Sequence, residues 1–226
     1  MDDISSTIQR ICIMMPTLLA ALVLHEYAHA WVAKKCGDST ADWSGRLTLN
    51  PIAHLDLFGS VIFPLFSLLF NTGMLFMWAK PVPINPTQFR NYRKGLFLVS
   101  SAGVAMNLVL GFLSAFILIA FLKYAPVNFA LYQALKEMLM AFIQVNFWLA
   151  VFNLIPIPPL DGSNILLSFL SYNASRKFME LQAYSFYIIM ALMFTGALRV
   201  ITYPIMILTN LAIILAASVL GFAPTL

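Results

Sequence analysis

Long apolar segments separated by short polar loops are the main feature of the chain. A helix that crosses a bilayer needs about 20 consecutive, mostly apolar residues. Five segments meet this requirement, at about 11–33, 96–122, 138–157, 181–198 and 201–222. A sixth, at about 58–78, is interrupted by Pro64 and by Asn71, Thr72 and Gly73, so it is predicted to turn back inside the membrane. The pattern predicts an all-α polytopic membrane protein with five to six transmembrane helices.

Two loops between these segments have patterns of their own. The stretch from Asp42 to Asp56 alternates polar and apolar residues around Arg46–Leu49, which predicts a short strand or hairpin. The stretch from Lys80 to Lys94 contains three prolines, which predict extended, non-helical chain. Neither loop is long enough to form a soluble module, so we expect a single domain over residues 1–226.

Composition and charge support a membrane protein and suggest its orientation. The chain is 61% hydrophobic and 10% charged, whereas soluble domains carry about 25% charged residues. The formal charge of +4 is therefore expected to set topology rather than to bind nucleic acid. If the N-terminus is outside and segment 58–78 is re-entrant, nine lysines and arginines lie on the cytoplasmic side and four outside. If that segment crosses, the split is six against seven, so the positive-inside rule favours the first arrangement.

The sequence His25-Glu26-x-x-His29 places three ionisable groups inside the first apolar segment. Residues four apart lie on one face of a helix, so both imidazoles can bind one ion. Glu26 lies about 100° further round the helix and can reach a water bound to that ion. This pattern predicts one Zn²⁺ per chain, with Glu26 as general base. A catalytic zinc site typically has three protein ligands, so one more ligand is needed.

The third ligand has to come from another segment. Asp161 follows an apolar segment and three prolines and is itself followed by a glycine. An ionisable group so deep in an apolar chain is a candidate for a functional role. His54, which is the only other histidine, is the alternative ligand. In the favoured topology His25, His29 and Asp161 all lie toward the cytoplasmic ends of their helices.

At these residues the chain resembles the site-2 protease family of intramembrane zinc metalloproteases. The sequences "HEYAH" and "NLIPIPPLDG" fit the family's two metal-ligand motifs. The sequence "SSAGVAMNLVLG" fits its Gly-Pro-x-x-Asn-type helix, with Asn107 as the asparagine and Val104 in place of the usual proline. The sequences "RLTLNPIAHLDLFGS" and "WAKPVPINPTQFRN" resemble a compact branch without PDZ or CBS domains. The expected catalytic core covers about 11–170, and peripheral helices cover about 178–222.

The resemblance implies hydrolysis of a peptide bond in or near the transmembrane helix of a substrate. His25, His29 and Asp161 would bind Zn²⁺, and Glu26 would be the general base and later the proton donor. The implied substrates are single-span membrane proteins, such as anti-sigma factors, or remnant signal peptides. The enzyme would be a multi-pass protein of the cell membrane, with its active site toward the cytoplasmic side. The sequence does not indicate an oligomeric state.

Several further residues are expected to bind the substrate. A helix must unwind before water attacks its carbonyls, because they are held in hydrogen bonds within the helix. The expected strand, with Arg46, Leu47 and Thr48, would pair with the unwound stretch by its edge. Asn107 is expected to hydrogen-bond the same stretch, as the asparagine of this family is thought to do. Asn153 is expected to act in the site through its motif.

Two polar residues keep open interpretations. His54 either stabilises the reaction intermediate or positions substrate, or it is a loop histidine bonded to Asp56 or to backbone. Asn146 lies seven residues before Asn153 on the same face of one segment. For Asn146 we expect a helix–helix contact rather than a role in the site.

Three other functions compete with proteolysis. A zinc transporter needs further ligands on several helices near the membrane midplane, and the sequence has no such series. An inactive scaffold that binds membrane proteins has no need of Glu26. A zinc hydrolase acting on lipid or another small amide fits the motif equally well, and only the strand-like substrate elements favour a peptide.

Overall fold

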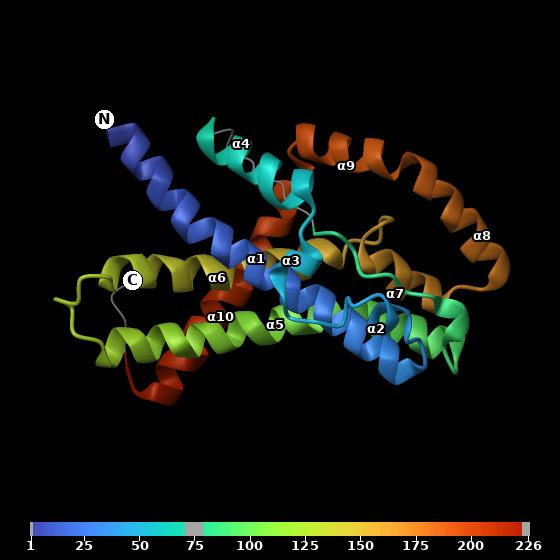
Figure 1. Cartoon of the computed structure of the whole chain (residues 1–226), viewed down its shortest axis with the longest axis horizontal. Helices are drawn as coiled ribbons and strands as arrows, with labels where there is room; N and C mark the ends of the chain where they lie inside the picture. The colour runs from blue at the N-terminus through green and yellow to red at the C-terminus, as the bar shows by residue number, and fades with distance from the viewer. Residues whose placement is uncertain (1, 71–78, 223–226) are drawn as a thin grey trace.

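The computed structural model describes residues 2–70 and 79–222, and helices dominate both stretches (Figure 1). Four helices in these stretches are long and apolar enough to cross a membrane. They are α1 (Asp2–Cys36), α5 (Tyr92–Tyr124), α6 (Tyr132–Asn153) and α10 (Thr202–Leu220). The all-α polytopic prediction is thereby confirmed. Four of the predicted apolar segments correspond to these helices, with α6 ending at Asn153 rather than at residue 157.

Helix α5 is the centre of the bundle. It packs against α1, α6, α10 and the short α7 (Asp161–Phe169), and α1 lies across α5 and α6 in Figure 1. A fully buried apolar cluster joins α5, α6 and α10 through side chains such as Leu118, Phe147 and Ala216. Helix α5 also has an exposed apolar face. Val109, Leu113 and Ile117 are spaced by four and exposed, as expected of a face turned to lipid.

The predicted span at 181–198 is not among the four candidate spans, because no single α-helix of spanning length covers it. This segment is divided into the 3₁₀ helix η3 (Leu181–Tyr184), α9 (Ser185–Phe194) and the 3₁₀ helix η4 (Ala197–Ile201). Gly196 has a φ of 71°, a left-handed conformation that ends α9. Ten residues of helix rise only about 15 Å, half the thickness of the hydrocarbon core. Helix α8 (Tyr172–Glu180) precedes this segment, and in Figure 1 it forms the outer edge of the molecule with α9.

The described part of segment 58–78 also lacks a helix of spanning length. It consists of the π-helix η1 (Leu57–Ile62) and α4 (Phe63–Leu69). Asp56 caps η1, because its Oδ1 accepts the amide of Gly59 at 2.7 Å. Pro64 lies at the junction of η1 and α4, where its missing N–H interrupts the backbone hydrogen bonds of a continuous helical stretch. The turn predicted at Asn71–Gly73 falls outside the described residues.

The strand predicted around Arg46–Leu49 is absent, and none of the described residues forms a strand. Turns and bends connect α2 (Thr40–Trp43) to α3 (Pro51–His54) instead. Local hydrogen bonds explain this. The amide of Arg46 donates to the carbonyl of Ala41 at 2.8 Å, and the side chain of Asn50 caps α3. Because these backbone groups are already hydrogen-bonded within the loop, few remain to pair with a strand from another segment.

The prediction for the proline-rich loop is confirmed in its first half. Residues 79–85 have neither helix nor strand. The 3₁₀ helix η2 (Pro86–Gln88) follows, and Asn91 caps the start of α5 by accepting the amide of Lys94 at 3.0 Å.

Candidate metal centre

The three predicted metal ligands converge between α1 and α7. His25 and His29 are one turn apart on α1, and Asp161 is the first residue of α7. The two Nε2 atoms are 3.0 Å apart, and each lies 3.3 Å from Asp161 Oδ2. Both histidines are buried, and the Asp161 side chain is 15% exposed. Within residues 2–70 and 79–222 this is the group of histidine, cysteine and acidic side chains arranged to hold a metal ion.

The hydrogen bonds of this cluster leave unprotonated atoms that favour the binding of a cation. Nδ1 of His29 faces the carbonyl of Val99 at 2.7 Å, and Nδ1 of His25 faces Oδ1 of Asn107 at 2.5 Å. Both partners are acceptors, so both Nδ1 atoms carry the proton and both Nε2 atoms present lone pairs. Oδ2 of Asp161 is buried and has no hydrogen-bond donor. Three acceptor atoms therefore face one another.

The spacing of the three atoms is close to that of a tetrahedral zinc site. Tetrahedral zinc with ligand bonds of about 2.0–2.2 Å holds its ligand atoms about 3.3–3.6 Å apart. The observed separations of 3.0 and 3.3 Å are close to this range. The ligand types, two imidazoles and one carboxylate, also match a catalytic zinc site with a position left for water.

Two glycines allow the helices to approach the ligands. A Cβ at Gly103 of α5 would lie 2.5 Å from Cε1 of His25 and 2.5 Å from Nε2 of His29. A Cβ at Gly162 would collide with the backbone carbonyl of Leu154. Glycine at these positions lets α5 pack directly on the imidazoles and lets α7 begin close to the end of α6.

Glu26 is half-buried beside the ligands and is held by backbone from another segment. Its Oε2 accepts the amide of Val82 at 2.8 Å. Val82 belongs to the extended segment 79–85 and packs against Ala30 and Leu47. The predicted substrate residue Leu47 is thus part of the packing that positions this segment.

Hydrogen bonds hold the extended segment 79–85 in place at both ends. The guanidinium of Arg46 donates to the carbonyls of Lys80 at 2.6 Å and Pro81 at 3.4 Å. The amide of Lys80 donates to the carbonyl of His54 at 3.0 Å, and the amide of Asn85 donates to Asp38 at 2.6 Å. These contacts keep Val82 next to Glu26.

The remaining predicted residues are not part of the ligand cluster. His54 is buried, its Nε2 donates to the carbonyl of Thr48 at 2.8 Å, and its Nδ1 has no hydrogen-bond partner. Thr48 also accepts the amide of Asn50 at 3.1 Å. Asn107 is fully buried and bonds His25, which places it behind the ligands. Asn153 donates to the carbonyl of Leu149 in its own helix at 3.0 Å.

Three contributors to the site were not expected from the sequence. The Val82 amide is a backbone group and gives no sequence signal. Gly103 lies inside the motif that contains Asn107, but its role depends on where α1 packs. The helix–helix contact predicted for Asn146 is confirmed, because this residue of α6 is fully buried and accepts a hydrogen bond from Nδ2 of Asn107 of α5 at 2.8 Å. What was not expected is the link that Asn107 makes from Asn146 to His25. A polar amide in an apolar helix was the signal that could have drawn attention to it.

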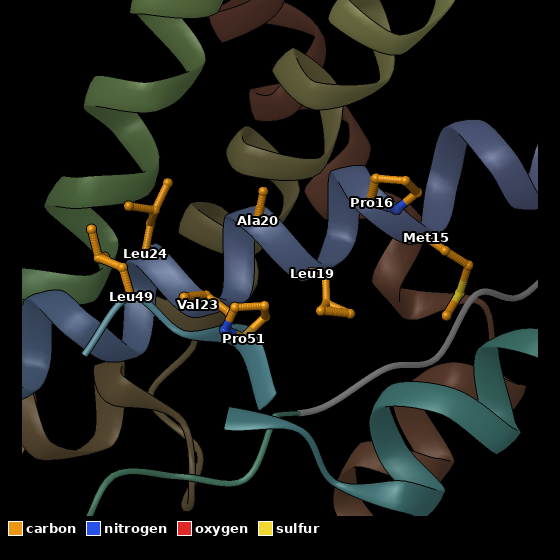
Figure 2. A pocket seen from close by; sticks show the side chains of 8 residues that line it. All are labelled: Met15, Pro16, Leu19, Ala20, Val23, Leu24, Leu49 and Pro51. Carbon is orange, nitrogen blue, oxygen red and sulfur yellow. The ribbon is translucent and has the colours of Figure 1, made fainter. Parts of the chain in front are cut away.

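An apolar groove lies along α1 on the N-terminal side of the ligands (Figure 2). Its volume is about 590 Å³. On the lining face of α1, Leu19 and Val23 are followed at helical spacing by Glu26, so the groove leads toward the carboxylate. Leu49, in the loop before α3, and Pro51, the first residue of α3, form the other wall. The residues of α1 that line the groove are Met15, Pro16, Leu19, Ala20, Val23 and Leu24.

Comparisons with known proteins identify the family of the chain. The profile of peptidase family M50 matches residues 125–196, which include Asn153 and Asp161. YwhC of Bacillus subtilis, which is named as a zinc metalloprotease, is 37% identical over 84% of this chain and 84% of its own length. Rip2 of Mycolicibacterium smegmatis, also named as a zinc metalloprotease, is 31% identical over 80% of this chain and 66% of its own length. No solved structure gives a significant match.

The similarity to YwhC extends over most of both chains and is accompanied by a buried ligand cluster in a bundle of apolar helices. The chain therefore belongs to peptidase family M50, the site-2 protease family, and is a multi-pass membrane zinc metalloendopeptidase.

Proposed function

We propose that the enzyme cleaves a peptide bond in or near the transmembrane segment of a membrane protein. His25, His29 and Asp161 are the proposed zinc ligands, and Glu26 is the proposed general base. The observation that carries this proposal is the convergence of three buried acceptor atoms, two Nε2 and one Oδ2, beside a carboxylate within an apolar bundle. An isolated cluster of this kind in apolar surroundings costs free energy unless a cation binds it.

The residues of the chain divide the chemistry between them. When bound, zinc supplies a Lewis acid that polarises a carbonyl and lowers the pKa of a water ligand. Glu26 takes a proton from the attacking water and later gives it to the amine that leaves. The Val82 amide holds Oε2 of Glu26, so we assign the proton transfer to Oε1.

The substrate segment is proposed to lie in the apolar groove of α1. The groove is lined by apolar side chains, and Glu26 lies three residues beyond the lining residue Val23, about one turn further along the helix. A substrate helix there must unwind near Glu26 before its carbonyl is attacked. The expected strand at Arg46–Leu49 is absent, so the extended segment 79–85 takes its place as the proposed partner for the unwound backbone.

The site is proposed to open toward the cytoplasm. His29 is about 10 Å and His25 about 16 Å from the C-terminal end of α1 along the helix axis. Lys34 and Lys35 are at that end, and the positive-inside rule places such residues on the cytoplasmic side. The two native free cysteines, Cys12 and Cys36, are first replaced by serine. A cysteine that then replaces Lys35 should react with a membrane-impermeant thiol reagent only after cells are permeabilised. Labelling in intact cells would contradict this orientation.

The decisive experiment for the reaction compares the wild type with Glu26→Gln in detergent. The substrates are a panel of single-span proteins that includes anti-sigma-factor and remnant-signal-peptide types. We expect the wild type to cut within a span, Glu26→Gln to lose cleavage, and both to retain about one zinc per chain. Glu137→Gln is the matched control, because Glu137 bonds only an exposed amide, Nε2 of Gln9 at 2.9 Å, and should not alter cleavage.

Two results would overturn the proposal. Wild-type cleavage rates in Glu26→Gln would remove Glu26 from the chemistry. Hydrolysis of lipid or small amides by a zinc-loaded wild type that cuts none of the spans would replace the peptide substrate with that class.

A further inference from the structure

A chain of buried amide groups leads from the metal centre into the helix bundle. Nδ1 of His25 bonds Oδ1 of Asn107 at 2.5 Å, and Nδ2 of Asn107 bonds Oδ1 of Asn146 at 2.8 Å. Nδ2 of Asn146 then bonds the backbone carbonyl of Phe142 at 2.8 Å. Asn107 and Asn146 are 0% exposed, so water does not compete for these groups. The chain joins α1, α5 and α6.

The direction of every hydrogen bond in this chain is set at its far end. The carbonyl of Phe142 can only accept, so Asn146 has to present its NH₂ group there. Its oxygen then faces Asn107, which has to present its own NH₂ group in turn. The oxygen of Asn107 is left facing His25, so Nδ1 of His25 carries the proton. Nε2 of His25 is consequently the unprotonated nitrogen, the form that binds a metal ion.

The two histidines obtain this arrangement in different ways. His29 donates directly to the backbone carbonyl of Val99 at 2.7 Å, which a side-chain substitution does not remove. His25 depends on two side chains that lie on two other helices. A half-satisfied buried network is costly, so loss of either amide is expected to disturb the next one.

We propose that Asn146 is a positioning residue of the metal centre, which acts through Asn107 to fix the proton on Nδ1 of His25 and to direct Nε2 at the metal. This inference rests on the proposed ligand set. It gives Asn146 a function other than helix packing, although it touches neither metal nor substrate.

Zinc affinity in a double-mutant cycle tests the proposal. Dissociation constants would be measured by chelator competition for the wild type, Asn146→Leu, Asn107→Leu and the double variant. We expect each single variant to weaken zinc binding by about 10–100-fold, as is usual for partners of metal ligands. Because Asn146 acts only through Asn107, the double variant should bind no more weakly than Asn107→Leu. Additive losses would show that Asn146 acts by packing and would overturn the proposal.

Ser114→Ala is the matched control. Ser114 is a buried polar residue two turns beyond Asn107 on α5, and it bonds only the carbonyl of Leu110 in its own helix at 2.6 Å. Its removal should leave the dissociation constant for zinc unchanged.

His25→Ala separates the inference from the ligand assignment. Wild-type affinity in that variant would refute the ligand set, whereas lost affinity there with wild-type affinity in Asn146→Leu would refute only the role of Asn146.

NMR spectroscopy of the wild type tests the proposed proton position on His25 directly. The chain has three histidines, so selective ¹⁵N labelling gives three imidazoles to assign. In the zinc-bound wild type we expect a protected Nδ1–H resonance of His25 with a nuclear Overhauser contact to the side-chain amide protons of Asn107. Its absence would overturn the proposal. In Asn146→Leu, or in Asn146→Ala if the first variant does not fold, this proton should exchange faster with solvent.

Discussion

Substitution of Gly103 by alanine tests the closeness of α5 to the metal centre. The new Cβ would lie 2.5 Å from Nε2 of His29 and 2.5 Å from Cε1 of His25, whereas ordinary contacts begin at 3.4 Å. Both rings, or α5 itself, therefore have to move by about 0.9 Å. Zinc sites hold their ligand distances within about 0.2 Å. We expect zinc affinity to fall by at least the 10–100-fold that is typical for loss of a ligand's supporting partner.

The same substitution should change the stability of the metal-free protein only slightly. Alanine is favoured over glycine in a helix by about 1 kcal/mol, which offsets part of the cost of about 1–3 kcal/mol for overpacking against the two buried, hydrogen-bonded rings. Chelator competition and thermal unfolding with and without zinc would separate the two effects. We expect weaker zinc binding, with a metal-free Tm close to that of the wild type or slightly lower.

Gly111→Ala is the control for overpacking on the same helix. Its Cβ would meet the ring of Phe147 at 2.6 Å, two turns away from the ligands. Overpacking of this kind costs about 1–3 kcal/mol, so Gly111→Ala should lower Tm while it retains zinc. Wild-type zinc affinity in Gly103→Ala would refute the close approach of α5 to His25 and His29.

Two further predictions concern the segment beside Glu26 and the metal itself. Arg46→Ala removes the guanidinium from the carbonyls of Lys80 and Pro81, which should speed hydrogen exchange at the Val82 amide and cost about 1.5–3 kcal/mol of stability. Zinc content should be unchanged. Lys34→Ala, which breaks an exposed ion pair, should cost less than about 1 kcal/mol, and equal effects of the two variants would contradict the anchoring role. Zinc at about 1,000 times its dissociation constant should stabilise the wild type by about 4 kcal/mol in thermal unfolding, and zinc-dependent stability of similar size in His25→Ala would contradict the ligand assignment.

Local sequence patterns were sufficient for the long helices and for the ligand pair on α1. A run of about 20 apolar residues has few alternatives to a helix in a membrane, because lipid offers no partner for its backbone groups. His25 and His29 share a helix face simply because they are four residues apart. Asp161 was recognisable because a carboxylate within an apolar, proline-rich stretch requires a compensating partner.

The same kind of pattern failed where a single residue or a loop contact decided the outcome. The apolar composition of 181–198 predicted a span, but the left-handed turn at Gly196 ends the helix after Phe194. The alternation around Arg46–Leu49 predicted a strand, but the backbone there bonds within its own loop. Alternation describes which faces are apolar and does not provide a second strand to pair with.

Only the tertiary structure decided how the ligands and the base are oriented. His25 is oriented by Asn107, which is 82 residues away, and Asn107 by Asn146, a further 39 residues along the chain. Glu26 is held by the Val82 amide, 56 residues away, and backbone amides are alike in every sequence. Helical periodicity relates residues within one or two turns of each other. The sequence therefore predicted which groups form the candidate metal centre, and the packing of α1 against α5, α6 and segment 79–85 decided which of their atoms face one another.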